Sequence, residues 1–368
     1  MPSQMSPLTR RRFAQLSSLA LAATQLPAQT PAKRIGYAAV GLGSISDIFM
    51  RGCAQSELSA VTGLVTGHPA DKGARYAARY NVPADSIYTY ETFDRIRDNK
   101  DVDAVYVGLP NSMHAEYTTR AAKAGKHVLC EKPMAISVAE GRSMIDACHK
   151  ANVRLMIAYR LHYDPTWKHA FDLIRSGELG QVESFMGGYW GFQPAEAWRV
   201  NRKLAGGGSL MDLGIYPLNC IRYLTGEEPS TYAAMVATRE HSPRFSEVEQ
   251  SVEWSMKFPS GIIGSCASSY GASGPALMRI NCEKGYLELG NCFTYDGIHL
   301  KGQIGSGPTA RQIEDNGTGK RPFQFTLEAD HFSDCIRNNR EADTPGEEGL
   351  KDMLAMEAIY KSAGTPLG

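Results

Sequence analysis

An apolar stretch that ends in closely spaced glycines, RIGYAAVGLGSIS at residues 34–46, constrains the fold of this chain most. It predicts a buried strand that passes through Gly41-Leu42-Gly43 into a helix from about 47 to 56. In such a turn the first glycine permits the sharp bend, the second lets a pyrophosphate approach, and the helix start offers amide donors. Ser46 stands where a third glycine is usual, and glycine also suits other tight turns, so the context must decide.

The segments that follow alternate between strand and helix. Strands are predicted at 59–65, 103–108, 126–131 and 153–158, and helices at 69–80, 91–98, 113–124 and 137–151. This order is typical of a doubly wound parallel sheet, which we expect to form an NADP-binding Rossmann domain over 34–158.

Ligands of such sheets bind at the carboxyl ends of the strands, where LPNSMH (109–114) and CEKP (130–133) fall. The sequence therefore predicts a cofactor crevice lined by Gly41, Gly43, Ser44, Ile45, Leu109, Pro110, Asn111, His114, Glu131 and Lys132.

The end of the second strand indicates which nicotinamide cofactor would fit. An acidic residue there would bind a ribose 2′-hydroxyl, but Val65-Thr66-Gly67-His68 has none before Asp71. Thr66 and Lys72 offer a hydroxyl and a cation suited to a phosphate, which favours NADP. In the alternative interpretation, Lys72 is an ordinary solvated lysine.

From about 160 onward the pattern becomes β-rich, and 368 residues is more than one typical core supports. Apolar runs at 182–190, 231–239, 247–258, 261–270 and 276–289 predict an α+β domain over 159–345 with a large, open, mostly antiparallel sheet. Its free face would suit a second subunit. Residues 302–322 are predicted to be a long loop, and 346–368 a C-terminal helix that packs through Leu350, Met353, Leu354 and Ala358.

The N-terminus predicts export. Thr9-Arg10-Arg11-Arg12-Phe13 precedes a short apolar run that is too short to span a bilayer and ends in small residues. This resembles a twin-arginine signal, so we expect residues 1–28 to be removed and the protein to be periplasmic. A basic surface turn is the alternative.

Charge and cysteine spacing limit the partners. Lys and Arg equal Asp and Glu at 39 each, which gives no basic field for nucleic acid or a membrane surface, so a small-molecule partner is expected. The eight cysteines lack both the spacing of a disulfide framework and any CxxC pair, so we expect buried free thiols and no metal.

The second half carries its densest chemistry in AWRVNRKLAGGGSLMDLGIYPLN at 197–219. Asp212 and Tyr216 are four residues apart and would share one face of a helix. A nearby ammonium lowers a phenol pKa, and Lys132 is the candidate. Alternatively, Asp212 is a helix cap and Tyr216 a packed aromatic residue.

Four strings, GLGSIS, LPNSMHAEYTTRAAKAGKHVLCEKPMA, YRLHYDP and GGGSLMDLGIYPLN, resemble those of the Gfo/Idh/MocA oxidoreductases. The resemblance covers the chain after the signal. Many members have a histidine four residues after the aspartate, whereas Tyr216 resembles the glucose–fructose and aldose–aldose oxidoreductase subgroup.

The resemblance implies roles for individual residues. Lys132, Asp212 and Tyr216 would be catalytic: Tyr216 as base and then acid, Lys132 holding the reacting oxygen and lowering the phenol pKa, and Asp212 orienting sugar hydroxyls. Lys132–Pro133 is expected to be a cis peptide. Further substrate contacts are predicted at Arg160, His162, Tyr163 and Glu131, and further cofactor contacts at Glu131, Lys132, Arg160, Trp198, Arg199 and Tyr295.

The implied function is a periplasmic oxidoreductase with NADP bound so tightly that it does not dissociate. One aldose would be oxidised at C1 to a lactone and a second sugar, a monosaccharide or short oligosaccharide, reduced to an alditol by a ping-pong route. A homo-oligomer, dimer or tetramer, would form through the C-terminal sheet. Alternatives are a sugar dehydrogenase with exchangeable cofactor and a non-catalytic sugar-binding protein on the same fold. Either Tyr216 or Lys132 could accept the proton first.

Overall fold

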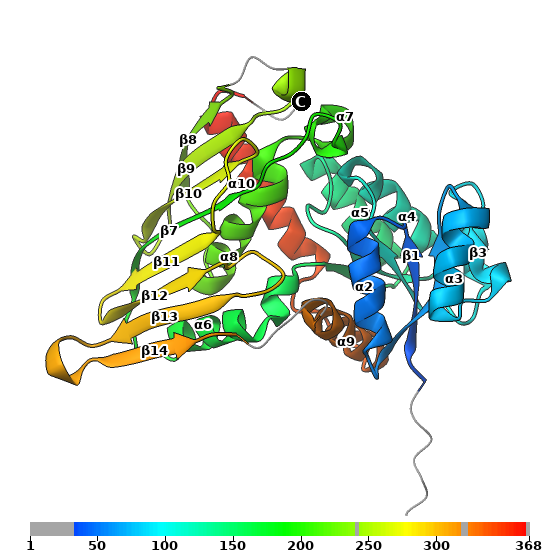
Figure 1. Cartoon of the computed structure of the whole chain (residues 1–368), viewed down its shortest axis with the longest axis horizontal. Helices are drawn as coiled ribbons and strands as arrows, with labels where there is room; N and C mark the ends of the chain where they lie inside the picture. The colour runs from blue at the N-terminus through cyan, green and yellow to red at the C-terminus, as the bar shows by residue number, and fades with distance from the viewer. Residues whose placement is uncertain (1–32, 240–242, 318–322, 366–368) are drawn as a thin grey trace, which may run out of the picture. The chain divides into compact units, whose positions relative to one another are not determined.

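The computed structural model of the chain describes residues 33–239, 243–317 and 323–365. The predicted signal at 1–28 lies outside the described residues. Two sheets organise the described part, a six-stranded parallel sheet and an eight-stranded, mostly antiparallel sheet, shown in Figure 1. The predicted α/β fold class is therefore confirmed.

The six-stranded sheet has the order β3-β2-β1-β4-β5-β6, with all neighbours parallel. Its strands lack polar alternation because helices cover both faces, and every residue of β1 is buried. The two-residue β3 was not predicted, because it is too short to show a pattern. The strands are β1 (Ile35–Val40), β2 (Ser59–Val65), β3 (Ile87–Tyr88), β4 (Ala104–Val107), β5 (His127–Cys130) and β6 (Leu155–Ile157).

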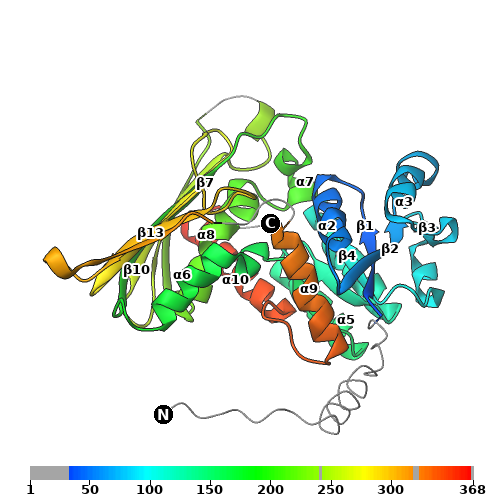
Figure 2. The same cartoon turned by 60° about the horizontal axis from the view of Figure 1, so that its bottom comes forward.

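Helices cover both faces of this sheet, as Figures 1 and 2 show. The helices within its sequence are α2 (Ser44–Ala54), α3 (Ala74–Tyr80), α4 (His114–Lys123) and α5 (Val138–Lys150). The predicted helix at 69–80 begins with a π-helical turn, and the one predicted at 91–98 is a 3₁₀ turn. A late helix, α9 (Phe323–Arg337), also packs here, because Phe325 and Phe332 share a core with Tyr37 and Phe49.

The eight-stranded sheet has the order β14-β13-β12-β11-β7-β10-β9-β8, and only β7 and β10 pair in parallel. The β-rich run predicted over 276–289 forms a hairpin, because a turn at Glu283 and Lys284 divides it into two strands. The loop predicted over 302–322 was wrong in part, because β13 and β14 pair there. The strands are β7 (Val182–Trp190), β8 (Thr231–Ala237), β9 (Ser251–Lys257), β10 (Ile263–Ser269), β11 (Leu277–Cys282), β12 (Gly285–Gly290), β13 (His299–Ile304) and β14 (Arg311–Asp315).

Among the described elements, helices cover only one face of this sheet in Figures 1 and 2. Exposed apolar side chains of four strands, Met186, Met235, Ile263 and Leu277, mark strands with an uncovered side. The remaining helices are α6 (Pro165–Arg175), α7 (Arg202–Ala205), α8 (Ile215–Thr225) and α10 (Gly346–Ser362).

The helix α10 packs through part of the predicted set, because Leu350 is partly buried against the core. Met353 is buried as expected, together with Met356 and Ile359, whereas Leu354 is 40% exposed. Leu354 also fits the helical spacing of apolar residues in the sequence. The side of α10 that is buried, however, is the side that carries Met353.

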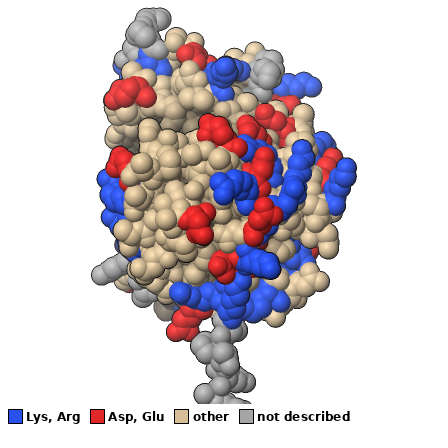
Figure 3. Space-filling view, turned by 90° about the vertical axis from the view of Figure 1, so that its right-hand side faces the viewer, with Lys and Arg blue, Asp and Glu red and all other residues tan. Residues whose placement is uncertain are grey.

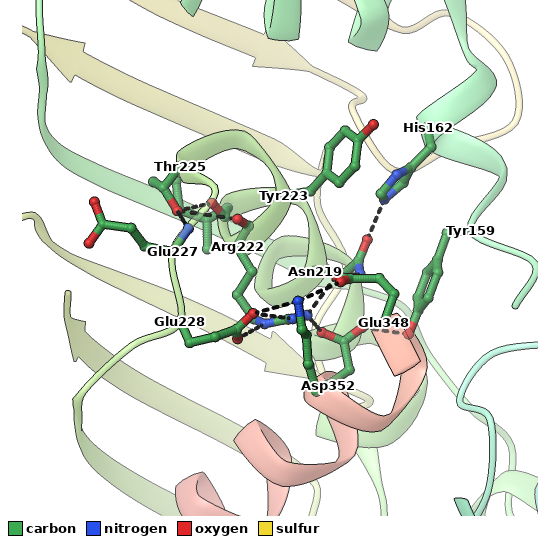
Figure 4. Close-up of polar contacts among 12 residues, drawn as sticks. Tyr159, His162, Asn219, Arg222, Tyr223, Thr225, Glu227, Glu228, Glu348 and Asp352 are labelled. Carbon is green, nitrogen blue, oxygen red and sulfur yellow. Dashed lines mark hydrogen bonds and ion pairs between the residues drawn. The ribbon is translucent and has the colours of Figure 1, made fainter. Parts of the chain in front are cut away.

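A buried ion cluster joins α8 to α10 (Figure 4). Arg222 of α8 forms ion pairs with Asp352 and Glu348 of α10 and donates to Glu228, with its Nε 2.6 Å from Glu228 Oε2. The Tyr159 hydroxyl donates to Asp352 Oδ2 at 2.6 Å. Burial raises the pKa of Asp352 to about 6, against the effect of Arg222. The cluster fixes α8 at the end opposite to Tyr216.

The cysteines are free thiols, and all except Cys282 are buried, as predicted. Burial raises the pKa of Cys148 to about 12. No three His, Cys, Asp or Glu side chains gather into a metal site within the described ranges. In the same ranges, no helix is both long and apolar enough to cross a bilayer. On the face in Figure 3, basic and acidic side chains are interspersed.

Candidate active site

The glycine turn between β1 and α2 has the predicted geometry. Gly41 has φ +81°, and a Cβ there would lie 2.6 Å from Leu109 Cδ2. Gly43 precedes the first residue of α2, and a Cβ at Gly43 would meet no protein atom within 4 Å. The turn therefore leaves open space at the start of α2, where the free amides favour an anionic group.

A cavity of about 400 Å³ lies at the carboxyl ends of the parallel strands. Thirteen of the predicted site residues line it, namely Ser44, Ile45, Leu109, Asn111, His114, Glu131, Lys132, Arg160, Trp198, Arg199, Asp212, Tyr216 and Tyr295. Residues of both halves of the chain are thus brought together in one place. The sequence did not predict five further lining residues, Ile48, Ala158, Tyr189, Gln193 and Leu213.

Some predicted residues lie outside this lining. Gly41 and Gly43 form the neighbouring turn, and Pro110, Thr66 and Lys72 are likewise not part of the cavity wall. Thr66 is buried at the end of β2, and its Oγ1 accepts a hydrogen bond from the His68 amide at 3.2 Å. The expected contact of Thr66 and Lys72 with the 2′-phosphate of NADP stays a prediction.

Lys132 is held between Asp212 and Tyr216. Its Nζ donates to the Asp212 carbonyl oxygen at 2.9 Å and lies 3.5 Å from Asp212 Oδ1. The same Nζ lies 4.3 Å from the ring centroid of Tyr216, over its face. The Lys132–Pro133 peptide is cis, as predicted. His114 joins this turn to the β4 loop, because its ring nitrogens contact the carbonyls of Pro133 and Leu109.

The cation at the Tyr216 hydroxyl is Arg160 rather than Lys132. Arg160 Nη2 donates to Tyr216 Oη at 3.2 Å. Burial raises the pKa of Tyr216, and Arg160 is the foremost group opposing that rise. The expectation that Lys132 lowers this pKa below its usual value was wrong, because its ammonium lies over the ring and burial outweighs the cations.

Asp212 holds two cations of the cavity, Lys132 and Arg199, in place. Its Oδ2 lies 3.0 Å from Arg199 Nε and accepts from the Tyr270 hydroxyl at 3.1 Å. Burial alone would raise the pKa of Asp212, but Arg199 and Lys132 hold it below the usual range. An ionised Asp212 that is bonded in this way positions Lys132. Its expected contact with sugar hydroxyls stays a prediction.

Arg160 is fixed from several sides. It donates to the carbonyls of Phe293 at 2.7 Å and Thr294 at 3.0 Å, and also to Gln324 of α9. Its guanidinium lies 4.4 Å from the ring centroid of Tyr295. A cation held by this many contacts is already positioned for charge that develops on the Tyr216 oxygen.

Glu131 precedes Lys132 and also reaches the cavity. It accepts hydrogen bonds from the Tyr106 hydroxyl and from the Lys132 amide, the latter at 3.2 Å. Burial raises the pKa of Glu131.

His162 and Tyr163 do not line this cavity, but His162 lines a small second cavity that Lys132 and Tyr216 also border. The expected contact of His162 and Tyr163 with a sugar stays a prediction. They follow Arg160 in a 3₁₀ turn, where consecutive side chains point in different directions. His162 Nε2 contacts Asn219 Oδ1 at 2.7 Å, and burial lowers the His162 pKa to about 4. Tyr163 lies 3.3 Å from Thr344 Oγ1.

Sequence reasoning missed Tyr189 and Tyr270, which lie near the carboxyl ends of the parallel pair β7 and β10. Burial raises the pKa of Tyr189 to about 12. Each tyrosine is close to a glycine at the end of an apolar run, Gly191 and Gly271, and this was the one signal available.

Comparisons with known proteins agree with this arrangement. Residues 35–159 match the model of an oxidoreductase family with an NAD-binding Rossmann fold. Residues 167–288 match the GFO/IDH/MocA C-terminal domain. The chain belongs to the Gfo/Idh/MocA family of NAD(P)-dependent sugar oxidoreductases.

Individual relatives include enzymes of sugar oxidation. The crystal structure of aldose–aldose oxidoreductase from Caulobacter crescentus, complexed with glycerol, is 43% identical, with a TM-score of 0.85 over 90% of this chain and 98% of that one. D-xylose 1-dehydrogenase [NADP(+)] from Haloarcula marismortui is 28% identical over 90% of this chain and 91% of its own. A levoglucosan dehydrogenase complexed with NADH and levoglucosan, at 23% identity over 90% of this chain and 97% of that one, shares the fold with a TM-score of 0.78.

Proposed function

We propose that the protein oxidises an aldose at C1 to an aldonolactone and transfers the hydride, through NADP that stays bound, to the carbonyl of a second sugar. The observation that carries this proposal is the convergence of Tyr216, Lys132 and Arg160 on one cavity beside the glycine turn. The 43% identity to an aldose–aldose oxidoreductase supports it.

The residues present fit a dinucleotide. Open space at Gly43 and the start of α2 would receive the pyrophosphate, and Trp198 and Arg199 would contact the cofactor from the other half. The absence of a carboxylate in residues 65–70 favours NADP over NAD. When bound, this cofactor accepts the hydride from C1 and later delivers it to a carbonyl carbon.

The protein supplies the proton transfer. Tyr216, as phenolate, takes the proton of the C1 hydroxyl while the hydride leaves C1, and Arg160 stabilises the phenolate. Lys132 donates a hydrogen bond to the reacting sugar oxygen, and Asp212 keeps that ammonium in place. In the second half of the cycle Tyr216 returns the proton to the oxygen of the reduced sugar.

Export with the cofactor inside belongs to the same proposal. The twin-arginine-like sequence at residues 9–13 would carry a folded protein to the periplasm. NADP that is buried during cytoplasmic folding would then need no external supply.

The name of the xylose relative favours a second candidate function, a dehydrogenase with exchangeable NADP. Mass spectrometry of the small molecules released when the dialysed protein is denatured separates the two. Stoichiometric NADP(H) is expected. Empty protein, or NAD, would contradict the proposal of tightly bound NADP.

A second copy of the chain is the proposed partner at the uncovered face of the eight-stranded sheet. Met235 is 72% exposed, and it lines one groove on this sheet together with Met186 and Leu277. Contiguous exposed apolar side chains of this kind mark a protein–protein interface. Light scattering should show dimers or tetramers, and Ile263→Asp should dissociate them. A monomeric unaltered protein at micromolar concentration would contradict this partner.

A further inference from the structure

We propose that Glu249 is a positioning residue, whose carboxylate fixes the start of the helical segment that carries Asp212 and Tyr216. Glu249 is 7% exposed and lies just before β9. Its Oε2 accepts from the Gly208 amide at 2.8 Å, and its Oε1 accepts from the Leu210 amide at 3.0 Å. This inference rests on the proposed function, because it assigns a role in that same site.

Of the two bonded amides, that of Leu210 is one that a helix leaves without a partner, and that of Gly208 lies just before the helical segment. A π-helical turn at Leu210–Gly214 continues directly into α8, so the helical segment runs from Leu210 to Thr225. The first amides of a helix have no acceptor within the helix, and a carboxylate there also opposes the positive end of the helix dipole. Glu249 therefore supplies a cap from outside the segment.

The glycine run before this segment makes the approach of Glu249 possible. A Cβ at Gly208 would lie 2.2 Å from the Glu249 carbonyl oxygen and 2.8 Å from Oε2. A Cβ at Gly207 would lie 2.5 Å from the Tyr360 hydroxyl. Any side chain at either position would displace the cap or the residue behind it.

Tyr360 of α10 orients the cap from behind. Its hydroxyl donates to Glu249 Oε1 at 2.8 Å, so three donors hold the buried carboxylate. Because both of its oxygens are hydrogen-bonded, the Glu249 carboxylate has little freedom to rotate. It therefore holds the backbone amides of Gly208 and Leu210 in fixed positions.

The distance from the cap to the chemistry is short. Asp212 follows Leu210 by two residues, and its carbonyl and carboxylate oxygens are the contacts of Lys132. Tyr216 lies one further turn along. A shift at Gly208 would therefore move the lysine and the phenol relative to each other, and small misplacements of reacting groups cost turnover more than binding.

The first test is Glu249→Gln, because the amide keeps one acceptor but turns a donor toward a backbone N–H. Turnover should fall roughly 10–10²-fold, with little change in KM and in bound cofactor. Hydrogen exchange of residues 206–216 should become faster. Gly208→Ala should reproduce both effects by pushing Glu249 away.

Two control variants separate positioning from general stability. Gly274→Ala adds a methyl group where no atom lies within 4 Å, and it should change neither turnover nor exchange. Ser333→Ala removes buried hydroxyl contacts to Tyr37 and Ser59 far from the cavity, and it should lower the melting temperature without lowering turnover.

The proposal is overturned if exchange in 206–216 stays unchanged in Glu249→Gln. It is equally overturned if turnover falls no more than in Ser333→Ala at a similar loss of melting temperature. If the unaltered protein turns over no sugar, the proposed function fails, and the exchange comparison alone then decides whether Glu249 caps the segment.

Discussion

Two groups of buried charges lie along the same helical segment, at Asp212–Tyr216 and around Arg222, and they differ in what they face. At the first, Arg199 keeps 37% of its side chain exposed and Lys132 keeps 11%, and both border the cavity. At the second, Arg222 is 1% exposed and its ion pairs are with acids of the protein (Figure 4).

The difference shows that buried charge alone does not identify a functional site. The Arg222 cluster has shifted pKa values, as the cavity has, but its donors are satisfied by Asp352, Glu348 and Glu228. In the cavity, cations also border space that a ligand can occupy. The first group should therefore control turnover, and the second should control stability.

The largest expected effect is on turnover at the cavity. Tyr216→Phe removes the proton-transferring hydroxyl and keeps the shape, so kcat should fall by about 10²–10⁴-fold. The melting temperature and cofactor content should hardly change. Initial rates with an aldose and an acceptor sugar test this, and near-normal turnover would reassign the base to Lys132.

The next effect concerns the ion cluster around Arg222 and is an effect on stability rather than on turnover. Arg222→Met leaves Asp352 buried without its cation, which should cost about 3–5 kcal/mol of unfolding free energy. Turnover per folded molecule should persist. Urea unfolding, combined with rates at low denaturant, measures both, and loss of turnover without loss of stability would break the comparison.

A smaller effect is expected in the pH dependence of sugar oxidation. Oxidation requires the phenolate, so its rate should rise with pH through the Tyr216 pKa. Because Arg160 opposes the rise caused by burial, Arg160→Met should move this basic limb of the pH–rate profile to higher pH. Arg160→Lys serves as the control that keeps a charge and should shift it less.

Lys132→Met should move the basic limb of the pH–rate profile less than Arg160→Met, because the Lys132 ammonium lies over the Tyr216 ring and not at its hydroxyl. A larger shift in Lys132→Met than in Arg160→Met would instead support Lys132 as the cation that lowers the Tyr216 pKa.

The smallest effect on stability is expected at the edge of the Arg222 cluster. Lys351 is 50% exposed and lies 3.5 Å from Glu228 Oε1. Lys351→Ala should change the unfolding free energy by about 0.5 kcal/mol or less, because an exposed ion pair gains little in water. A loss of unfolding free energy as large as that of Arg222→Met would show that Lys351 contributes to stability as much as the buried ion pairs of Arg222 do.

Much of the fold could be predicted because buried strands leave continuous apolar runs. The strand over 59–65 has the predicted ends, and 182–190 does as well. By contrast, β14 is a sheet-edge strand that is largely exposed and polar, so 302–322 looked like a loop.

The candidate site was predictable by its motifs but not by its contacts. The strings around Lys132, Asp212 and Tyr216 predicted residues that the structure brings together in one cavity. Which cation meets the phenol oxygen depends on tertiary distances that no spacing along the chain encodes. For the same reason, the contact of Tyr270 with Asp212 and that of Glu249 with Gly208 could not be found from sequence.

The central claim, that one sugar reduces a retained cofactor and another reoxidises it, can be tested by recording the near-ultraviolet absorbance of reduced nicotinamide. Purified protein receives an aldose alone, with no added cofactor, and then an excess of a second sugar. The account predicts a rise that is stoichiometric with the protein, followed by its loss as an alditol forms. No rise without added NADP, or a rise that no sugar discharges, would contradict it.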